Sequence, residues 1–253
     1  MNTIFIKEEK IKSTNLFGRF PAVLKNTLLM VRYNLKIIFG NKFIYFLLAA
    51  IALTLFIIGV NLFSGDAMGE AGIYRILILT GSLLLFYPAA FGIQSDKDAR
   101  TLEIIFGIPD YRYRVWLMRL LLIYAITAVI LFFISELLRF TFLSFSVFEM
   151  VYQVFYPLAF LGLLTFLLST VLKSGNATAA VVIILGIVLL IMSDSISRTF
   201  WNIFFNPYAV PSDVSEMAWQ SITTKSRVFL GAGAMVFLLG GLMNLQRREK
   251  LLG

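Results

Sequence analysis

Six long apolar runs, separated by short polar segments, dominate the pattern of the chain. A helix of about 20 apolar residues crosses the hydrocarbon core of a bilayer. The alternation of apolar and polar residues that builds a membrane β-barrel is not found. The pattern therefore predicts an all-α integral membrane protein. Its six predicted transmembrane helices cover residues 43–63, 73–93, 115–135, 151–172, 177–192 and 228–245.

Two segments precede the first predicted span. Residues 1–18 are polar with mixed charge, and we expect them to form a mobile cytosolic tail. Over residues 19–40, apolar side chains recur every three or four positions, which predicts an amphipathic helix. This helix is expected to lie in the membrane surface beside anionic head groups; an ordinary helix packed on a neighbour is the alternative. Its basic face carries Lys25, Arg32 and Lys36.

The charge distribution predicts the orientation of the membrane domain, residues 41–253. Six spans place both ends of the chain on the same side of the membrane. Most of the 22 Lys and Arg residues lie on that side, and the positive-inside rule makes it cytosolic. We therefore expect a multi-pass protein of the inner or plasma membrane with both termini in the cytosol. The net charge of +8 reflects this orientation and not a nucleic-acid partner.

The polar segment between the second and third spans, residues 94–114, has a helical pattern of its own. Ser95 or Asp96 can cap a helix start. An apolar stripe at helical spacing follows, after which Gly107 and Pro109 end the helix. The pattern predicts a short cytosolic helix, a break, and a second helix that leads into the third span. The apolar stripe consists of Leu102, Ile105 and Phe106.

Aromatic residues gather between the fifth and sixth spans, in residues 193–226. Asp213 and Glu216 have the spacing of a capping box for a helix over residues 214–224. We expect two short helices in the outer leaflet, which form either an outer gate or an aromatic belt that anchors the loop. The candidate gate residues are Trp201, Phe204, Phe205, Pro207 and Tyr208.

Composition narrows the chemistry. The chain is 59% hydrophobic and 14% charged, and it contains neither Cys nor His, so disulfides and the common zinc motifs are excluded. It also lacks the phosphate-binding loop motif of P-loop ATPases. We therefore expect that the chain is not an enzyme and holds no metal or cofactor of its own.

The order of these elements resembles the permease subunit of ABC-2 type transporters, the membrane half of type V exporters. In that family, the segment before the third span often has an acidic-basic-acidic cluster, Gly-Thr-Leu-Glu, an apolar stretch, a Pro and basic residues. This chain departs at Arg100, where the family usually has Gly. The matching residues are Asp96, Lys97, Asp98, Thr101, Leu102, Glu103, Ile104, Ile105, Phe106, Pro109, Arg112 and Arg114.

The resemblance implies a coupling helix that docks into a groove on a separate cytosolic ATPase, which holds ATP and Mg. Two copies of that ATPase and a second permease, the same chain or a sister chain, would complete an exporter of hydrophobic or amphipathic cargo. The ATPase-coupling residues would be Asp96, Lys97, Asp98, Arg100, Thr101, Leu102, Glu103, Ile105, Phe106 and Pro109, with the apolar stripe as anchors in the groove.

The resemblance also implies a translocation path at the junction of the two permeases, lined by spans one, two and five. Thr80, Ser82 and Tyr87 on span two are the candidate path residues, and helix packing is the alternative for each. The glycines of span six, Gly231, Gly233, Gly240 and Gly241, are expected to permit close packing.

Two other classes of protein stay open. An ion-coupled transporter or channel usually has an ionisable residue inside the bilayer. The predicted spans have essentially none, because Arg119 lies near the cytosolic face and is expected to snorkel. A non-transporting membrane assembly factor would also explain a docking segment.

The apolar stripe generates the first prediction. Phe106→Ala should uncouple ATP hydrolysis from transport, because it removes an anchor from the groove, and should leave the membrane fold intact. ATP-driven export by membrane vesicles, beside the thermal unfolding midpoint of the purified variant, measures both effects. Normal ATP-driven export by the variant would contradict the prediction.

Overall fold

The computed structural model of the chain describes residues 43–64, 68–102, 105, 107 and 110–246. Within this part of the chain the fold is all-helical, and six helices are long and apolar enough to cross a membrane. The helices are α2 (Phe43–Ser64), α3 (Glu70–Asp98), α5 (Met118–Thr141), α6 (Val147–Leu172), α7 (Gly175–Ser195) and α8 (Glu216–Asn244), and the π-helical segment η1 (Arg112–Leu117) leads into α5.

The six predicted spans are confirmed as helices, and several run further than predicted. α3 continues through Gln94 to Asp98, so Ser95 and Asp96 lie in its last turn and do not cap a new helix. The extra turn is stable because its polar side chains have partners. The Gln94 side-chain oxygen accepts a hydrogen bond from the Gly175 backbone N–H, and Asp96 pairs with Arg119.

The predicted separate helix over residues 214–224 is wrong. The structure has one continuous helix, α8, that begins at Glu216 and includes the predicted sixth span. The hydroxyl of Ser215, and not the predicted Asp213, caps its start by accepting from the Ala218 N–H at 3.4 Å. No proline follows this cap, so the polar residues before the predicted sixth span can adopt the helical conformation. α8 therefore begins several turns before the apolar residues of that span.

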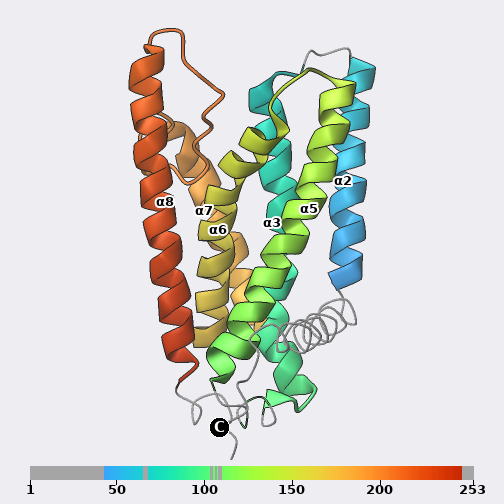
Figure 1. The fold of residues 1–253 in the computed structure, drawn as a ribbon, viewed down its shortest axis with the longest axis vertical. Helices are drawn as coiled ribbons and strands as arrows, with labels where there is room; N and C mark the ends of the chain where they lie inside the picture. Colours follow the sequence, from blue (N-terminus) through green and yellow to red (C-terminus); the bar gives the residue numbers. More distant parts are fainter. Residues whose placement is uncertain (1–42, 65–67, 103–104, 106, 108–109, 247–253) are drawn as a thin grey trace, which may run out of the picture.

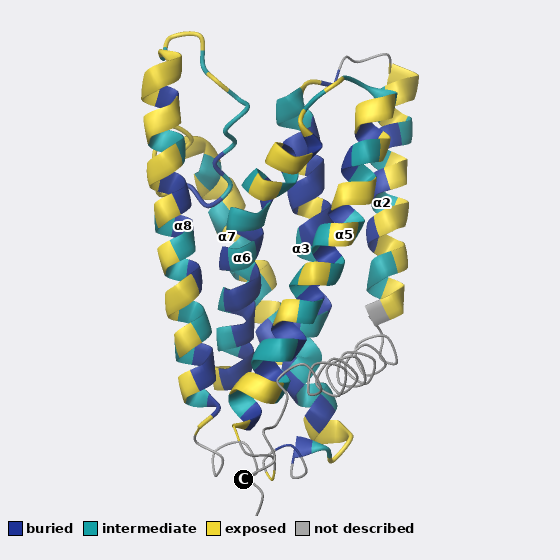
Figure 2. Cartoon of the chain, viewed as in Figure 1, coloured by how far each residue is buried: buried dark blue, intermediate teal, exposed yellow. Residues whose placement is uncertain are grey.

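α3 and α6 form the centre of the bundle (Figure 1). α6 packs on α8 and α3, while α3 also packs on α2, α5 and α7. α2 and α7 are peripheral, and most of their surface is exposed (Figure 2). In a membrane, exposed apolar side chains contact lipid or another apolar helix, so these two helices offer the largest area for such contacts.

Two connecting segments lie at opposite ends of this bundle (Figure 1). The central segment, residues 99–111, connects α3 to η1. The aromatic segment, residues 196–215, connects α7 to α8, and it contains turns but no helix in place of the two predicted ones. Near the end of α5, Glu136 and Arg139 form an ion pair of 2.9 Å.

The predicted amphipathic helix over residues 19–40, with Lys25, Arg32 and Lys36, lies outside the described residues. So do the tail before it and the final residues 247–253. The orientation of the basic surface helix therefore stays a prediction.

Two glycines let α8 approach the aromatic rings of α6. A methyl group on Gly233 would lie 2.5 Å from the Phe160 ring, and one on Gly241 would lie 2.6 Å from the Phe166 ring. A methyl group on Gly231 would meet no atom within 4 Å. The predicted role of these glycines in close packing is therefore confirmed for Gly233 and Gly241 and is wrong for Gly231.

This difference generates the second prediction. Gly241→Ala should lower the free energy of unfolding by about 1–3 kcal/mol, because it overpacks the α6–α8 contact. Gly231→Ala, in the same helix, should be neutral or stabilise by up to about 1 kcal/mol through helix propensity. Equilibrium unfolding in mixed detergent micelles measures both, and equal effects of the two changes would contradict the packing described.

Candidate functional site

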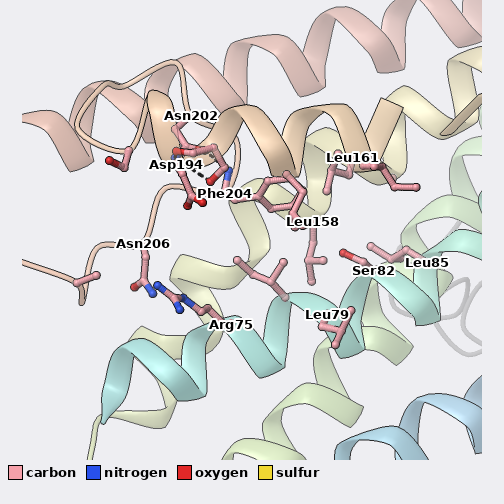
Figure 3. A pocket seen from close by; sticks show the side chains of 18 of the residues that line it. Arg75, Leu79, Ser82, Leu85, Leu158, Leu161, Asp194, Asn202, Phe204 and Asn206 are labelled. Atoms are coloured by element: carbon pink, nitrogen blue, oxygen red, sulfur yellow. Dashed lines mark hydrogen bonds between the residues drawn. The ribbon is translucent and has the colours of Figure 1, made fainter. Parts of the chain in front are cut away.

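A cavity of about 910 Å³ lies between α3, α6 and α7 at the end of the bundle that carries the aromatic segment (Figure 3). α3 contributes Arg75 and Ser82, α7 contributes Asp194, and the aromatic segment contributes Phe204 and other residues to the outer end. Ligand pockets in proteins typically have volumes of about 300–1,000 Å³. The cavity is therefore large enough for a drug-sized molecule.

The two ends of the cavity differ in polarity. Arg75, Asp194, Asn202 and Asn206 lie together at the outer end, as Figure 3 shows. The remaining wall is almost entirely aliphatic or aromatic, with the hydroxyl of Ser82 among apolar neighbours. The apolar lining residues include Ile78, Leu79, Leu85 and Phe86 of α3, Leu158 and Leu161 of α6, and Val182, Ile183, Ile187 and Leu190 of α7.

Most polar groups at the outer end already have partners. The amide of Asn202 bonds to Ser193 and to the Phe204 N–H, and the amide of Asn206 bonds to the Ala71 carbonyl and to the Tyr208 N–H. These bonds shape the aromatic segment and do not leave the amides free for a ligand.

The charged groups at this end divide into one pair and two free groups. Arg198 donates to Asp213 at 2.6 Å, and this hydrogen bond lowers the pKa of the Asp213 carboxyl from its usual value. Arg75 and Asp194 have neither an ion pair nor a side-chain hydrogen bond with any described residue. The Arg75 guanidinium and the Asp194 carboxylate are thus available to bind a ligand.

Of the three candidate path residues, only Ser82 lines the cavity. The hydroxyl of Thr80 faces α2, where it bonds to Thr54 at 2.6 Å, and it is 2% exposed. Tyr87 is buried in a stack between Phe46 and Phe91. Thr80 and Tyr87 therefore pack helices together and do not line this cavity, and their place on a translocation path between two permeases stays a prediction.

The aromatic segment is held across the outer end by hydrogen bonds from two helices, α3 and α8. The Tyr74 hydroxyl donates to the Phe205 carbonyl at 3.1 Å, and the Trp219 indole donates to the Pro207 carbonyl at 2.9 Å. Arg227 of α8 donates to the Tyr74 hydroxyl and to Gln153 of α6. Arg227 thus links α8 directly to α3 and α6, and Tyr74 and Trp219 attach the aromatic segment to α3 and α8.

The predicted gate residues have different places in this arrangement. Phe204 lines the cavity, whereas Phe205 is 1% exposed and stacks on Trp219. Tyr208 packs on Tyr74, and Trp201 is 57% exposed and lies against Phe229 of α8. Only Phe204 reaches the cavity, and Trp201 has the exposed position expected of a residue in an aromatic belt.

At the other end of α3, Asp96 is buried and not part of an exposed cluster. Its carboxylate accepts from Arg119 at 2.6 Å, and both side chains are more than nine-tenths buried. The Arg119 guanidinium also lies over the Trp116 ring of η1. The prediction that Arg119 snorkels to the membrane surface is wrong, because an acidic partner inside the bundle stabilises its charge.

Two described aliphatic side chains of the central segment, Leu102 and Ile105, pack inward. Leu102 and Ile105 are 3% and 7% exposed and belong to a hydrophobic cluster with Trp116 of η1, Phe166 of α6 and Leu245 after α8. They are therefore not exposed anchors in this structure. The Ile105 N–H donates to the Thr101 carbonyl, which gives one helical turn. Glu103, Phe106 and Pro109 lie outside the described residues, so the coupling helix itself stays a prediction.

The exposed part of this region consists of charged side chains. Lys97, Asp98 and Arg100 are exposed at the end of α3 and the start of the central segment. Arg100 has φ 54°, the left-handed region that glycine adopts without steric cost. ABC-2 permeases, which this segment resembles, usually have Gly at this position. Arg100 therefore adopts a backbone conformation that a glycine would adopt more easily.

Sequence reasoning missed three features of the site. It did not single out Arg75, Arg227 or Asp194. It also expected spans essentially without ionisable residues, which is wrong, since the described helices bury Asp96, Arg119 and Arg227. The available signal was that these charges occur within one or two turns of a predicted span end, where a longer helix would include them.

Comparisons were made with protein-family models, with curated proteins and with solved structures, and none matches this chain. Its function is therefore argued from its own geometry.

The buried ion pair generates the third prediction. Arg119→Met should lower the free energy of unfolding by about 3–5 kcal/mol, because it leaves the Asp96 carboxylate buried without a partner. The double variant Asp96→Leu/Arg119→Met should recover most of that loss, since it removes both charges. Equilibrium unfolding in mixed detergent micelles measures the free energies of unfolding of the single and double variants. Equal losses in the single and double variants would show that the pair is not the source of the effect.

Proposed function

We propose that this chain is the membrane-spanning permease subunit of an ABC-2 type exporter, and that a separate cytosolic ATPase supplies the hydrolysis. The supporting observation is that one unbroken helix, α3, carries both the cavity wall and an exposed charged end. From Ser82 in the cavity to Asp98, the rise of 1.5 Å per residue gives a length of about 24 Å. A force applied at one end of this helix therefore acts on the other.

The proposed mechanism uses α3 as a lever. ATP and Mg²⁺ are held by the partner ATPase, whose closure pushes on the central segment in the cytosol. The Asp96–Arg119 ion pair transmits this push to α5, and the inward stripe of Leu102 and Ile105 transmits it to η1 and α6. The α3 wall then shifts against α6 and α7, which changes the cavity and moves its contents outward.

The cargo in this proposal is hydrophobic or amphipathic, because the cavity wall is apolar over most of its length. α2 and α7 carry many exposed apolar side chains, including Leu48, Phe56, Ile184 and Ile191. A second permease, the same chain or a sister chain, covers part of this area, and membrane lipid covers the rest. Each permease binds one of two ATPase copies.

The structure changes which residues should contact the ATPase. Leu102 and Ile105 support the central segment from inside, so replacing them would damage this chain's own core. Lys97, Asp98 and Arg100 are the accessible side chains and therefore the proposed contacts. Opposite charges across an interface guide association, and like charges placed together cost several kcal/mol.

The fourth prediction tests this contact. The tagged chain is captured from native membranes in mild detergent, and the eluate is assayed for a bound ATPase and for ATP turnover. Lys97→Glu/Asp98→Lys should reduce the bound ATPase roughly tenfold or more, because it reverses the local charge pattern without changing the net charge.

The matched control exchanges charges at the opposite end of the bundle. Glu216→Lys/Lys225→Glu alters two exposed residues of α8 and should leave the bound ATPase at the native level. Equal loss in both variants would mean that Lys97 and Asp98 at the end of α3 are not the contact. Absence of an ATPase from the native eluate would overturn the proposal in favour of an ion-coupled carrier or an assembly factor.

A further inference from the structure

We propose that the cavity binds a single-chain zwitterionic amphiphile, a molecule with a phosphate, an ammonium group and one acyl chain, such as a lysophospholipid. The head group lies at the outer end between Arg75 and Asp194, and the acyl chain lies along α3, α6 and α7. Binding itself requires only this chain. That the ligand is also the exported cargo rests on the function proposed above.

The length of the apolar wall fits one acyl chain. From Arg75 to Phe86, eleven residues along α3 rise about 16 Å. Half of the hydrocarbon core of a bilayer, which is one leaflet, is about 15 Å thick. A chain with its head group at Arg75 therefore follows the wall for the depth of one leaflet. Ser82 on this stretch of α3 and Thr165 of α6 supply the hydroxyls of this otherwise apolar part of the lining.

The cavity is accessible from the surrounding lipid. Three of its lining residues on α7, namely Ile183, Ile187 and Leu190, are 52%, 53% and 63% exposed. Apolar side chains with this exposure contact acyl chains when a helix spans a membrane. An amphiphile can therefore move sideways from the leaflet into the cavity without its chain crossing water.

The charges at the outer end select the head group. Arg75 and Asp194 both line the cavity, and neither has a charged partner among the described residues (Figure 3). The neighbouring cation Arg198 is already paired with Asp213. A phosphate satisfies Arg75 and an ammonium group satisfies Asp194, whereas an anionic or neutral head group leaves one or both without a partner.

The volume limits the number of chains. A cavity of about 910 Å³ lies at the upper end of the range that drug-sized ligands fill. The polar outer end takes up part of that volume with the head group. One acyl chain therefore fills the apolar part, and a second chain of a diacyl lipid stays outside α7.

The fifth prediction tests the charges with three probes of equal acyl chain: lysophosphatidylethanolamine, lysophosphatidylglycerol and monoacylglycerol. Binding to the purified chain in a non-ionic detergent is measured by native mass spectrometry, without ATPase or nucleotide. The native chain should bind the zwitterionic probe most tightly and the neutral probe least. Arg75→Gln should weaken both phosphate-bearing probes roughly tenfold or more, the loss of a hydrogen bond to a charged group.

Asp194→Asn should weaken only the zwitterionic probe, because it removes only the partner of the ammonium group. Gly186→Leu should weaken all three probes, since Gly186 lines the cavity and a side chain there enters open space. Gly231→Leu, also in open space but away from the cavity, is the matched control and should bind like the native chain. Thermal unfolding midpoints show that each variant is folded.

The inference is overturned if the native chain binds monoacylglycerol as tightly as lysophosphatidylethanolamine, or if neither charge substitution changes the order of the probes. It is also overturned if Gly186→Leu leaves binding unchanged, because the ligand then lies elsewhere, or if only a lipid-free dimer is seen, because a second copy then fills the cavity. These failures leave ATPase capture through the central segment untouched. Conversely, normal probe binding with no captured ATPase would refute only the proposed exporter.

Discussion

The ion pair between Asp96 and Arg119 is the interaction on which the packing at one end of the bundle depends, the end that carries the central segment. It lets α3 continue past its apolar run, because the carboxylate in its last turn has a cationic partner on α5. The same arginine lies over Trp116, so the π-helical start of the next span is tied to the pair. A charge inside a membrane protein is costly without a partner, and here two charges offset each other at the point where three elements meet.

This arrangement divides the molecule into parts with different physical character. Near the central segment, the contacts are buried, charged or tightly packed, and they hold α3, α5 and α6 together. Near the aromatic segment, the helices separate enough to leave a cavity, and hydrogen bonds to a loop close its outer end. In the proposed exporter, the force from the ATPase and the ligand would act on opposite ends of the same helix.

The apolar pattern alone predicts the six helices and the positions of their centres, because bilayer thickness sets a strong length requirement. It does not predict their ends. Gln94 and Asp96 extend α3 through partners distant in sequence, and Ser215 caps α8 two residues after the position that the spacing favoured. It also does not predict the cavity. The small polar residues Thr80 and Ser82 are only two positions apart and look alike in the sequence, yet one bonds to α2 and the other faces the cavity. Only the packing of neighbouring helices distinguishes them.

The fit of α8 against α6 has a consequence for biosynthesis. α8 is the last of the described helices to be made, yet the Phe160 and Phe166 rings of α6 lie directly against its glycines. Until α8 leaves the insertion machinery, that face of α6 has only lipid or the machinery itself beside it. The nascent chain must therefore keep α6 in an incomplete bundle through the synthesis of α7 and the aromatic segment.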